Sequence, residues 1–246
     1  MTINDFDRWA QSIMPIAQFK KTDASLNGLQ VGKMDQKLEH ISFALDACAA
    51  SIAQANAQKA DMLFVHHGLF WGPAVPIEGI LYDQIQQLIQ RNIALYAVHL
   101  PLDAVPEFGN NARVAKILNL QNCEVFSDIG FVGDLPSVMS TQEIAQKVFA
   151  PHQPLIWDNC PSVKRVAVMV GGGARFTQKA AVAKADCYIT GEPLHQVFHF
   201  CQESNLSFIA GGHYYSEMIG LHSFKEQVKQ KFPALQTHWI DIPTGV

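Results

Sequence analysis

Short apolar runs alternate with amphipathic, Ala- and Gln-rich segments along most of the chain. In the first half this pattern predicts strands at 41–46, 61–67 and 93–99, and helices at 47–58, 82–92 and 110–119. A regular succession of strands and helices is typical of α/β proteins, in which helices connect the strands and flank the sheet. The pattern therefore predicts an α/β fold.

The second half repeats this order, and an ungapped offset of 125 residues aligns Lys59-Ala60-Asp61 with Lys184-Ala185-Asp186. The same offset places His66-His67 on Gly191-Glu192, and a small further shift places His99-x-x-x-Asp103 on His213-x-x-x-Glu217. The second half predicts strands at 166–171, 186–192 and 206–213, and helices at 173–185, 194–205 and 216–232.

Two Ala-rich units can resemble each other through composition alone, but the matching order of elements and the two His-x-x-x-acid motifs favour an internal duplication. We therefore predict two similar α/β domains, with sheets flanked by helices. The turn-rich segment 127–140 indicates a boundary, which gives a first domain at 1–126 and a second at 127–246. The C-terminal helix could pack on the first domain. Strand ends of such a pair would meet at an interdomain cleft, where ligands usually bind.

Composition narrows the class of protein. Of the 246 residues, 48% are hydrophobic and 16% charged, as in a well-packed globular protein. The net charge is −4 and the 18 Lys and Arg residues are scattered, which argues against nucleic acid or an anionic membrane as a partner. Five cysteines without CxxC spacing point to a reducing compartment. Residues 1–13 lack the pattern of a signal peptide, and no apolar run approaches the roughly 20 residues of a membrane span. We expect a cytoplasmic protein.

Histidines and carboxylates gather at the ends of the predicted strands. His66 and His67 end one strand, where Gly68 could supply a sharp turn, and His99 ends another. Neighbouring side chains of a strand point to opposite faces, so the adjacent histidines act together only if the strand stops there. Taken alone, the pair is more often one core and one surface histidine, and a His-x-x-x-acid spacing is an ordinary helical pair. Their conjunction at strand ends, in both halves, favours a metal site.

The candidate ligands outnumber the four of a closed zinc site, so two divalent ions about 3.5–4 Å apart fit them better. Imidazoles with carboxylates suit zinc, manganese, iron or nickel. Water bound to such a pair has a lowered pKa and could attack an electrophilic carbon or phosphorus at neutral pH. The candidate ligands and near-site groups are His66, His67, His99, Asp103, His213 and Glu217.

At these residues the sequence resembles the GTP cyclohydrolase I type 2 / NIF-three-like family of metal-binding proteins. The resemblance covers nearly the whole chain. It is carried by "SLNGLQVG" (25–32), "DMLFVHHGLFW" (61–71), "HLPLD" (99–103), "GNNARVAKILNL" (109–120), "DCYITGEPLHQ" (186–196) and "GGHYYSE" (211–217).

The resemblance implies two interlinked α/β domains, a dinuclear metal site and a ring-shaped homohexamer whose metal sites face an inner cavity. It assigns His99 to a position near the metals, where it would hold a water or Asp103 instead of binding an ion. Tyr214 and Tyr215 depart from the family's pattern of a second polar residue after His213, which alters the pocket and leaves the ligands intact. The family's ligands fall on His66, His67, Asp103, His213 and Glu217.

Several further residues have two interpretations each. Glu192 could act as acid or base, or could cap the following helix. The segment "GGGAR" (171–175) could form an anion nest, although a tight turn is the simpler interpretation. Phe70 and Trp71 could stack on a planar ring such as a purine, or pack in a core or an interface.

Two functions remain open at this point. The first is a dinuclear metal-dependent hydrolase that acts on a nucleotide or related small molecule by attack of metal-bound hydroxide, with Glu192 and His99 as catalytic groups. For GTP, this implies opening of the imidazole ring and release of formate. The second is a non-enzymatic metal-binding protein that forms a regulatory or assembly ring around a partner or a nucleic acid.

Overall fold

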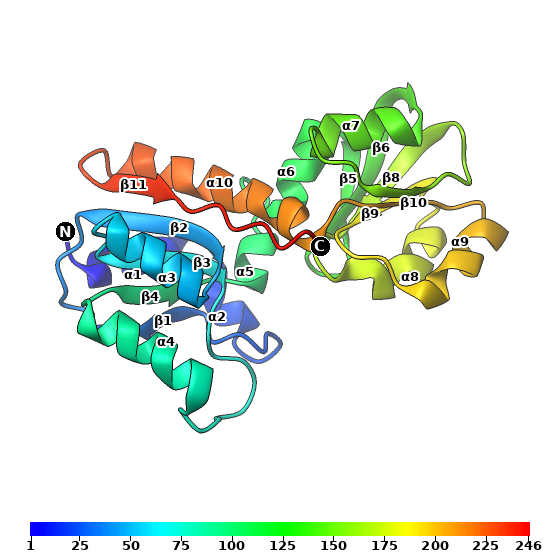
Figure 1. Ribbon diagram of the computed structural model, residues 1–246. Helices are drawn as coiled ribbons and strands as arrows, with labels where there is room; N and C mark the ends of the chain where they lie inside the picture. Colours follow the sequence, from blue (N-terminus) through cyan, green and yellow to red (C-terminus); the bar gives the residue numbers. More distant parts are fainter. The chain divides into compact units, whose positions relative to one another are not determined.

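The computed structural model describes residues 1–246. The chain forms two compact units. Unit 1 comprises residues 1–102 and 221–242, and unit 2 comprises residues 103–220 and 243–246. Each is an α/β unit with its own sheet and flanking helices (Figure 1), as the alternation of apolar and amphipathic segments predicts.

Unit 1 contains a five-stranded sheet in the order β1-β4-β3-β2-β11. Strands β11, β2, β3 and β4 are parallel, and β1 pairs antiparallel with β4 at one edge. The strands are β1 (Gly28–Val31), β2 (His40–Asp46), β3 (Met62–His67), β4 (Ala94–Ala97) and β11 (Gln236–Trp239). The helices are α1 (Ile3–Ile13), α2 (Ile16–Phe19), α3 (Ala49–Ala57) and α4 (Gly79–Gln90). Helix α5 (Leu100–Asp103) ends at the first residue of unit 2, and α10 (His213–Lys231) belongs to unit 1 from Leu221 onward.

Helices cover both faces of this sheet. On one face, Ile52 of α3 and Leu88 of α4 pack against apolar side chains of β2, β3 and β4. On the other face, Phe6 of α1 and Phe224 of α10 contact Phe64 of β3, with ring centroids 6.1 and 4.8 Å from that of Phe64. Because both faces are buried, the central strands consist almost entirely of apolar residues, as is usual for parallel strands.

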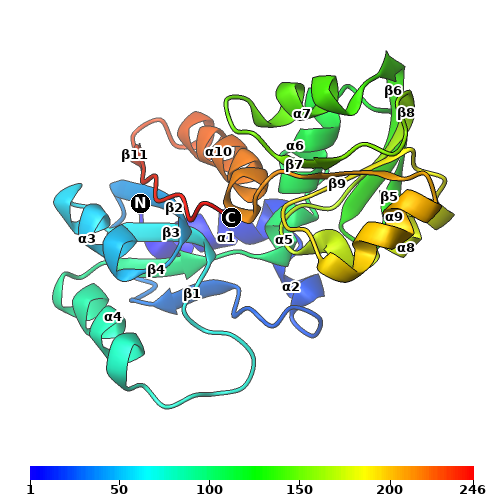
Figure 2. The ribbon, with the colours of Figure 1, turned by 45° about the vertical axis from the view of Figure 1, so that its right-hand side comes forward.

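Unit 2 contains a six-stranded sheet in the order β5-β6-β8-β9-β10-β7, in which β8, β9 and β10 are parallel. Figure 2 shows α6 and α7 on one side of the strands and α8 and α9 on the other. The strands are β5 (Gln121–Phe126), β6 (Gly130–Met139), β7 (Leu155–Trp157), β8 (Val163–Val168), β9 (Cys187–Thr190) and β10 (Ser207–Ala210). The helices are α6 (Asn110–Ile117), α7 (Thr141–Phe149), η1 (Gly173–Phe176), α8 (Thr177–Val182), η2 (His195–Val197) and α9 (Phe198–Glu203).

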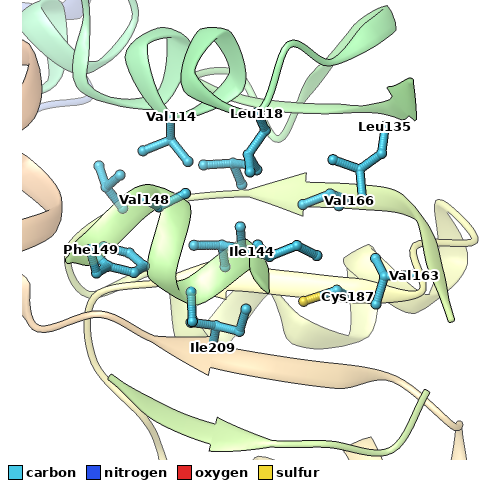
Figure 3. Close-up of a cluster of buried hydrophobic side chains, with 14 residues drawn as sticks. Val114, Leu118, Leu135, Ile144, Val148, Phe149, Val163, Val166, Cys187 and Ile209 are labelled. Atoms are coloured by element: carbon cyan, nitrogen blue, oxygen red, sulfur yellow. The ribbon is translucent and has the colours of Figure 1, made fainter. Parts of the chain in front are cut away.

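Branched aliphatic side chains dominate one core layer of unit 2 (Figure 3). Val114 of α6 and Ile144 of α7 are fully buried against Val166 of β8 and Ile209 of β10. The opposite face of the same strands packs against α8 and α9 through a second cluster that includes Tyr188 and Phe208. Alternate residues of each strand thus serve different helix layers, which fixes the register of the sheet.

The two sheets share a core of three parallel strands with an antiparallel strand at one side. Strands β2-β3-β4 and β8-β9-β10 are adjacent and parallel in the same order, and each set carries an antiparallel strand beside its third member, β1 or β7. A detailed feature repeats as well. Asp61 accepts hydrogen bonds at 2.8–2.9 Å from the backbone N–H groups of residues 39 and 40, and Asp186 accepts them at 2.8 Å from residues 164 and 165. These aspartates occupy aligned positions in the sequence, so the two units are similar domains, as the internal duplication predicts.

The segment 127–140, which the sequence marks as a boundary, lies inside unit 2. Strands β5 and β6 form an antiparallel hairpin whose turn is at 127–129, so the turn-forming residues there connect paired strands. No helix of the structure is long and apolar enough to cross a membrane.

Candidate metal centre

The three histidines of unit 1 converge at the ends of β3 and β4. His66 and His67 are the last residues of β3, and His99 follows β4. Their ring centroids are 4.7–5.6 Å apart, and their ligand nitrogens lie within 4.8 Å of one another. The adjacent histidines therefore act on one region, as the strand-end argument requires. His66 is fully buried, and its Nδ1 lies 2.9 Å from the carbonyl oxygen of Val98.

Carboxylates orient the other two rings. His67 Nδ1 lies 2.8 Å from Asp46 Oδ1, and His99 Nδ1 lies 2.8 Å from Asp23 Oδ1. Asp46 is paired with His67 in the register of β2 and β3, which places the two side chains next to each other. An acceptor at Nδ1 retains the ring hydrogen there, so the lone pair is at Nε2. This arrangement is the usual one for metal-binding histidines.

The loop that carries Asp23 fixes His99 from two sides. Asn27 Oδ1 accepts a hydrogen bond from the backbone N–H of His99 at 2.7 Å, and Asn27 Nδ2 donates to Asp23 Oδ2 at 2.8 Å. Burial raises the pKa of Asp23, but the hydrogen bonds with His99 and Asn27 outweigh it, and the pKa lies below its usual value. The segment "SLNGLQVG" therefore supports the histidine cluster.

Gly68 leaves room for the side chain of Gln30. It is absent from the residues with positive φ, but a Cβ there would lie 2.3 Å from Gln30 Nε2. Gln30 Oε1 accepts from the backbone N–H of Leu69 at 2.8 Å, and its Nε2 donates to the carbonyl of Leu26 at 2.7 Å. Glycine thus allows Gln30 to join the segment after the histidines to the loop before β1.

Unit 2 carries a second donor set at the start of α10. The sequence places His213 at the end of a strand, but β10 ends at Ala210 and His213 is the first residue of the helix. His213 and Glu217 are thereby one helical turn apart on the same face, with Nε2 and Oε2 separated by 2.9 Å. Two ligands about 2.1 Å from one ion lie about 3 Å apart when the angle is near 90–110°. The spacing of this pair fits a shared ion.

Glu192 orients His213. Its Oε1 lies 2.6 Å from His213 Nδ1, which directs Nε2 toward Glu217. The contact gives Glu192 the same relation to His213 that Asp46 has to His67. The alternative of a helix cap for Glu192 finds no support, because η2 begins after Leu194 and has no side-chain cap.

Asp103 belongs to the same set. It is 2% exposed, and its carboxylate lies within 4.8 Å of that of Glu217, which is 3% exposed. Asn110 Nδ2 donates to Asp103 Oδ1 at 2.8 Å, while Asn110 Oδ1 accepts from the backbone N–H of Gly220 at 2.7 Å. The segment "GNNAR" thus fastens Asp103 to helix α10.

The glycine-rich loop 171–173 brings backbone close to these ligands. Gly171 has φ +60°, and a Cβ there would lie 1.9 Å from Glu217 Oε1 and 3.3 Å from His213 Nε2. Its carbonyl accepts hydrogen bonds from the backbone N–H groups of Gly191 and Glu192 at 3.0 Å. The loop therefore brings its backbone into close approach with the donor set.

Comparisons with known proteins support the family resemblance of the sequence. The family described as Duf34/NIF3 (NGG1p interacting factor 3) matches residues 1–244. A GTP cyclohydrolase 1 type 2 homolog of Treponema pallidum is 34% identical, with 100% of each chain covered, and one of Pyrococcus horikoshii is 40% identical, with 91% of this chain and 92% of that one covered. The crystal structure of TTHA1606 from Thermus thermophilus superposes with a TM-score of 0.91 at 34% identity, covering 100% of both chains. The chain therefore belongs to the Duf34/NIF3 family.

Proposed function

We propose that the protein is a dinuclear metal-dependent hydrolase, and that its ions are divalent transition metals such as zinc, iron, manganese or nickel. The observation that carries this proposal is the orientation of the histidines. Each of the rings of His66, His67, His99 and His213 has an acceptor at Nδ1, between 2.6 and 2.9 Å away. The proposed ligands are His66, His67, Asp103, His213 and Glu217.

Burial of the carboxylates supports a cationic occupant. Asp103 and Glu217 are both almost completely buried, with carboxylate oxygens within 4.8 Å. Two negative charges so close and so far from water are costly unless a cation compensates them. Neutral imidazoles together with two carboxylates are the donors that borderline divalent ions select.

The ligand count supports a shared centre. Unit 1 supplies imidazoles without carboxylate ligands, and unit 2 supplies two carboxylates with one imidazole. Neither set alone has enough ligands to complete the coordination shells of two ions. The five ligand residues together with bound water would be enough. The chain passes from one unit to the other at Leu102–Asp103 and at Gly220–Leu221. Asp103 and Glu217 are therefore both within a few residues of such a boundary in the sequence. We propose that both sets serve one dinuclear centre.

Two divalent ions at this centre would activate water as a nucleophile at neutral pH and stabilise negative charge on the substrate. The chain's own residues would position these partners and handle protons. Glu192 holds the Nδ1 hydrogen of His213, and its side chain is 40% exposed, so it can exchange a proton with solvent. His99 shares its Nδ1 hydrogen with Asp23, so its Nε2 would be available to accept a proton from a bound water. We propose Glu192 and His99 as the catalytic groups.

The proposed substrate class is a nucleotide or a related small molecule, and GTP is the first candidate because relatives at 34–40% identity are named as GTP cyclohydrolase 1 type 2 homologs. Hydrolysis of GTP would open the imidazole ring of the base and release formate. The chain would act in the cytoplasm.

Exposed apolar side chains on α4 support assembly of the chain into a homo-oligomer, for which we propose the hexamer. Ile80 is 77% exposed, Ile89 65% and Tyr82 49%. Such a surface is typical of a protein–protein interface. The same surface favours a second candidate function, a metal-binding ring protein without catalysis. Light scattering that finds a monomer at micromolar concentration would refute the hexamer.

The test of the proposed function begins with metal content. Apo-protein is reloaded with zinc, manganese or iron, and elemental analysis is expected to find about two ions per chain. Formate release from GTP is then measured for each form. Asp103→Ala is expected to lose both bound metal and formate release, whereas His195→Gln, which alters an exposed histidine of η2, should behave as wild type. Well under one ion per chain would refute the metal centre, and full loading without turnover of any nucleotide would leave the non-catalytic function.

A further inference from the structure

Trp71 is an exposed indole held beside the histidine cluster of unit 1. Its ring centroid is 4.9 Å from that of His99, with an interplanar angle of 74°, and 5.9 Å from that of His67. The residue is nevertheless 40% exposed. A large aromatic side chain in contact with candidate metal ligands and also open to solvent offers a surface to a bound molecule.

The indole is rigidly held. Its Nε1 donates a 2.8 Å hydrogen bond to the carbonyl of Gly68. The backbone on either side is paired with the loop before β1, since the N–H of Leu26 donates to the carbonyl of Phe70 at 3.0 Å and the N–H of Gly72 donates to that of Ala24 at 2.7 Å. A ring fixed in this way loses little conformational entropy when a ligand packs on it.

A pocket of about 520 Å³ adjoins this loop within unit 1. It is lined in part by Ser25, Leu26 and Gly72, which flank or pair with the Trp71 segment, and by Lys20. Lys20 is the one cationic side chain among the lining residues, and the one anionic side chain there, Asp23, has its oxygens occupied by His99 and Asn27. The pocket has room for the polar remainder of a ligand whose ring lies on the indole, and its lysine suits an anionic group.

We propose that Trp71 is the stacking platform for the planar heteroaromatic ring of the substrate and thereby a specificity-determining residue. This inference rests on the proposed function. A purine base on the indole would lie next to His67 and His99, where hydrolysis of its ring would take place, while its ribose and phosphates would extend toward Lys20. Stacking on an aromatic side chain tolerates different bases because every base has a π-face. The site would therefore select planar bases over non-planar phosphate compounds.

The experiment compares wild type, Trp71→Leu and Trp71→Phe, each loaded with metal. Elemental analysis gives their metal content, and equilibrium dialysis gives their affinities for GTP and for inorganic triphosphate. We expect unchanged metal content, a loss of GTP affinity of roughly tenfold or more in Trp71→Leu, and a smaller loss in Trp71→Phe, because a base–aromatic stack contributes about 1–3 kcal/mol. Affinity for triphosphate should be the same in all three proteins.

Trp239→Leu is the matched control, because Trp239 is another indole of unit 1 that contacts a histidine, with its ring centroid 3.7 Å from that of His222. It should bind GTP as wild type does. The stacking role is overturned if Trp71→Leu binds GTP as tightly as wild type with its metal intact, or if the variant loses metal or changes oligomeric state in parallel with affinity. Wild type that binds metal but no nucleotide would instead refute the proposed substrate class.

Discussion

Gly171 is the position at which a single methyl group should disable the donor set of unit 2. Its backbone has φ +60°, in the left-handed region, and its α-carbon faces the Glu217 carboxylate. In Gly171→Ala the new Cβ would lie 1.9 Å from Glu217 Oε1, whereas real contacts of this kind are not shorter than 3.0 Å. The oxygen would therefore have to move by about 1 Å or more, which exceeds the tolerance of about 0.2 Å in metal–ligand distances.

The substitution should affect both the stability of the protein and its metal affinity, and the second effect should be larger. An alanine in the left-handed region costs about 1–2 kcal/mol, which lowers the melting temperature of a protein of this size by a few degrees. Displacement of a ligand costs more in binding, since disturbing even a residue that orients a ligand weakens metal affinity about 10- to 100-fold. We expect Gly171→Ala to remain folded and to lose at least tenfold in metal affinity.

Gly172→Ala is the matched control. Gly172 has φ −76°, which alanine adopts without strain, and a Cβ there would meet nothing within 4 Å. Metal affinity of both variants is measured by competition with a chromogenic chelator, and stability by thermal unfolding of the apo-protein. Equal metal affinity in the two alanine variants would refute the assignment of Glu217 as a ligand held against Gly171.

Other predictions concern two side chains that hold the ligands in place and one buried thiol of unit 2. Asp46→Ala removes the acceptor of His67 Nδ1 and should weaken metal affinity about 10- to 100-fold in the chelator assay. Asn110→Ala leaves Asp103 and a backbone N–H of α10 without their buried partner, so urea unfolding should show a loss of about 1–3 kcal/mol. Burial raises the pKa of Cys201 to about 11, so at pH 8 this thiol should resist a disulfide reagent until the protein unfolds.

Each of these predictions has a control in the same unit. Asp83→Ala changes an exposed carboxylate of α4 and should leave metal affinity unaltered. Gln146→Ala removes an exposed amide of α7 and should leave stability nearly unaltered. The exposed Cys123 should be modified while Cys201 is not. Loss of affinity in Asp83→Ala, equal unfolding of the two amide variants, or labelling of Cys201 in the native protein would contradict the respective argument.

The sequence reveals the candidate ligands better than it reveals the residues that orient them through hydrogen bonds. His66, His67 and His99 stand at the ends of apolar runs, so their convergence follows from the edge of a parallel sheet. Asp23 is separated from His99 by 76 positions, and no local pattern connects them. Asp46 ends a predicted strand, which is the one sequence signal that could have found it. The contact of Asp46 with His67 depends on the register of β2 and β3, and that register is set by packing across the whole sheet.

Two of the strands that escaped prediction have side chains that are not buried on a regular face. Strand β5 is exposed at every position except Phe126, so it lacks the apolar alternation that identifies a strand. Strand β11 has the sequence "QTHW" and is at most partly buried. Helix α7 is amphipathic and begins with a capping box formed by Ser140 and Glu143, a local signal that the pattern of apolar runs does not capture.

The duplication explains both the success of the motif comparison and its limit. The offset of 125 residues places His67 on Glu192 and Asp46 on Gly171. In unit 1, the aligned position of His67 and Glu192 carries an imidazole, and the aligned position of Asp46 and Gly171 carries the carboxylate that orients it. In unit 2, Glu192 carries the carboxylate, and it orients His213 of α10. An acidic side chain at position 171 is therefore not needed. A carboxylate at 171 would also overlap Glu217, because even a Cβ there is too close. The exchange of histidine for glutamate at one aligned position thus accounts for the glycine at the other.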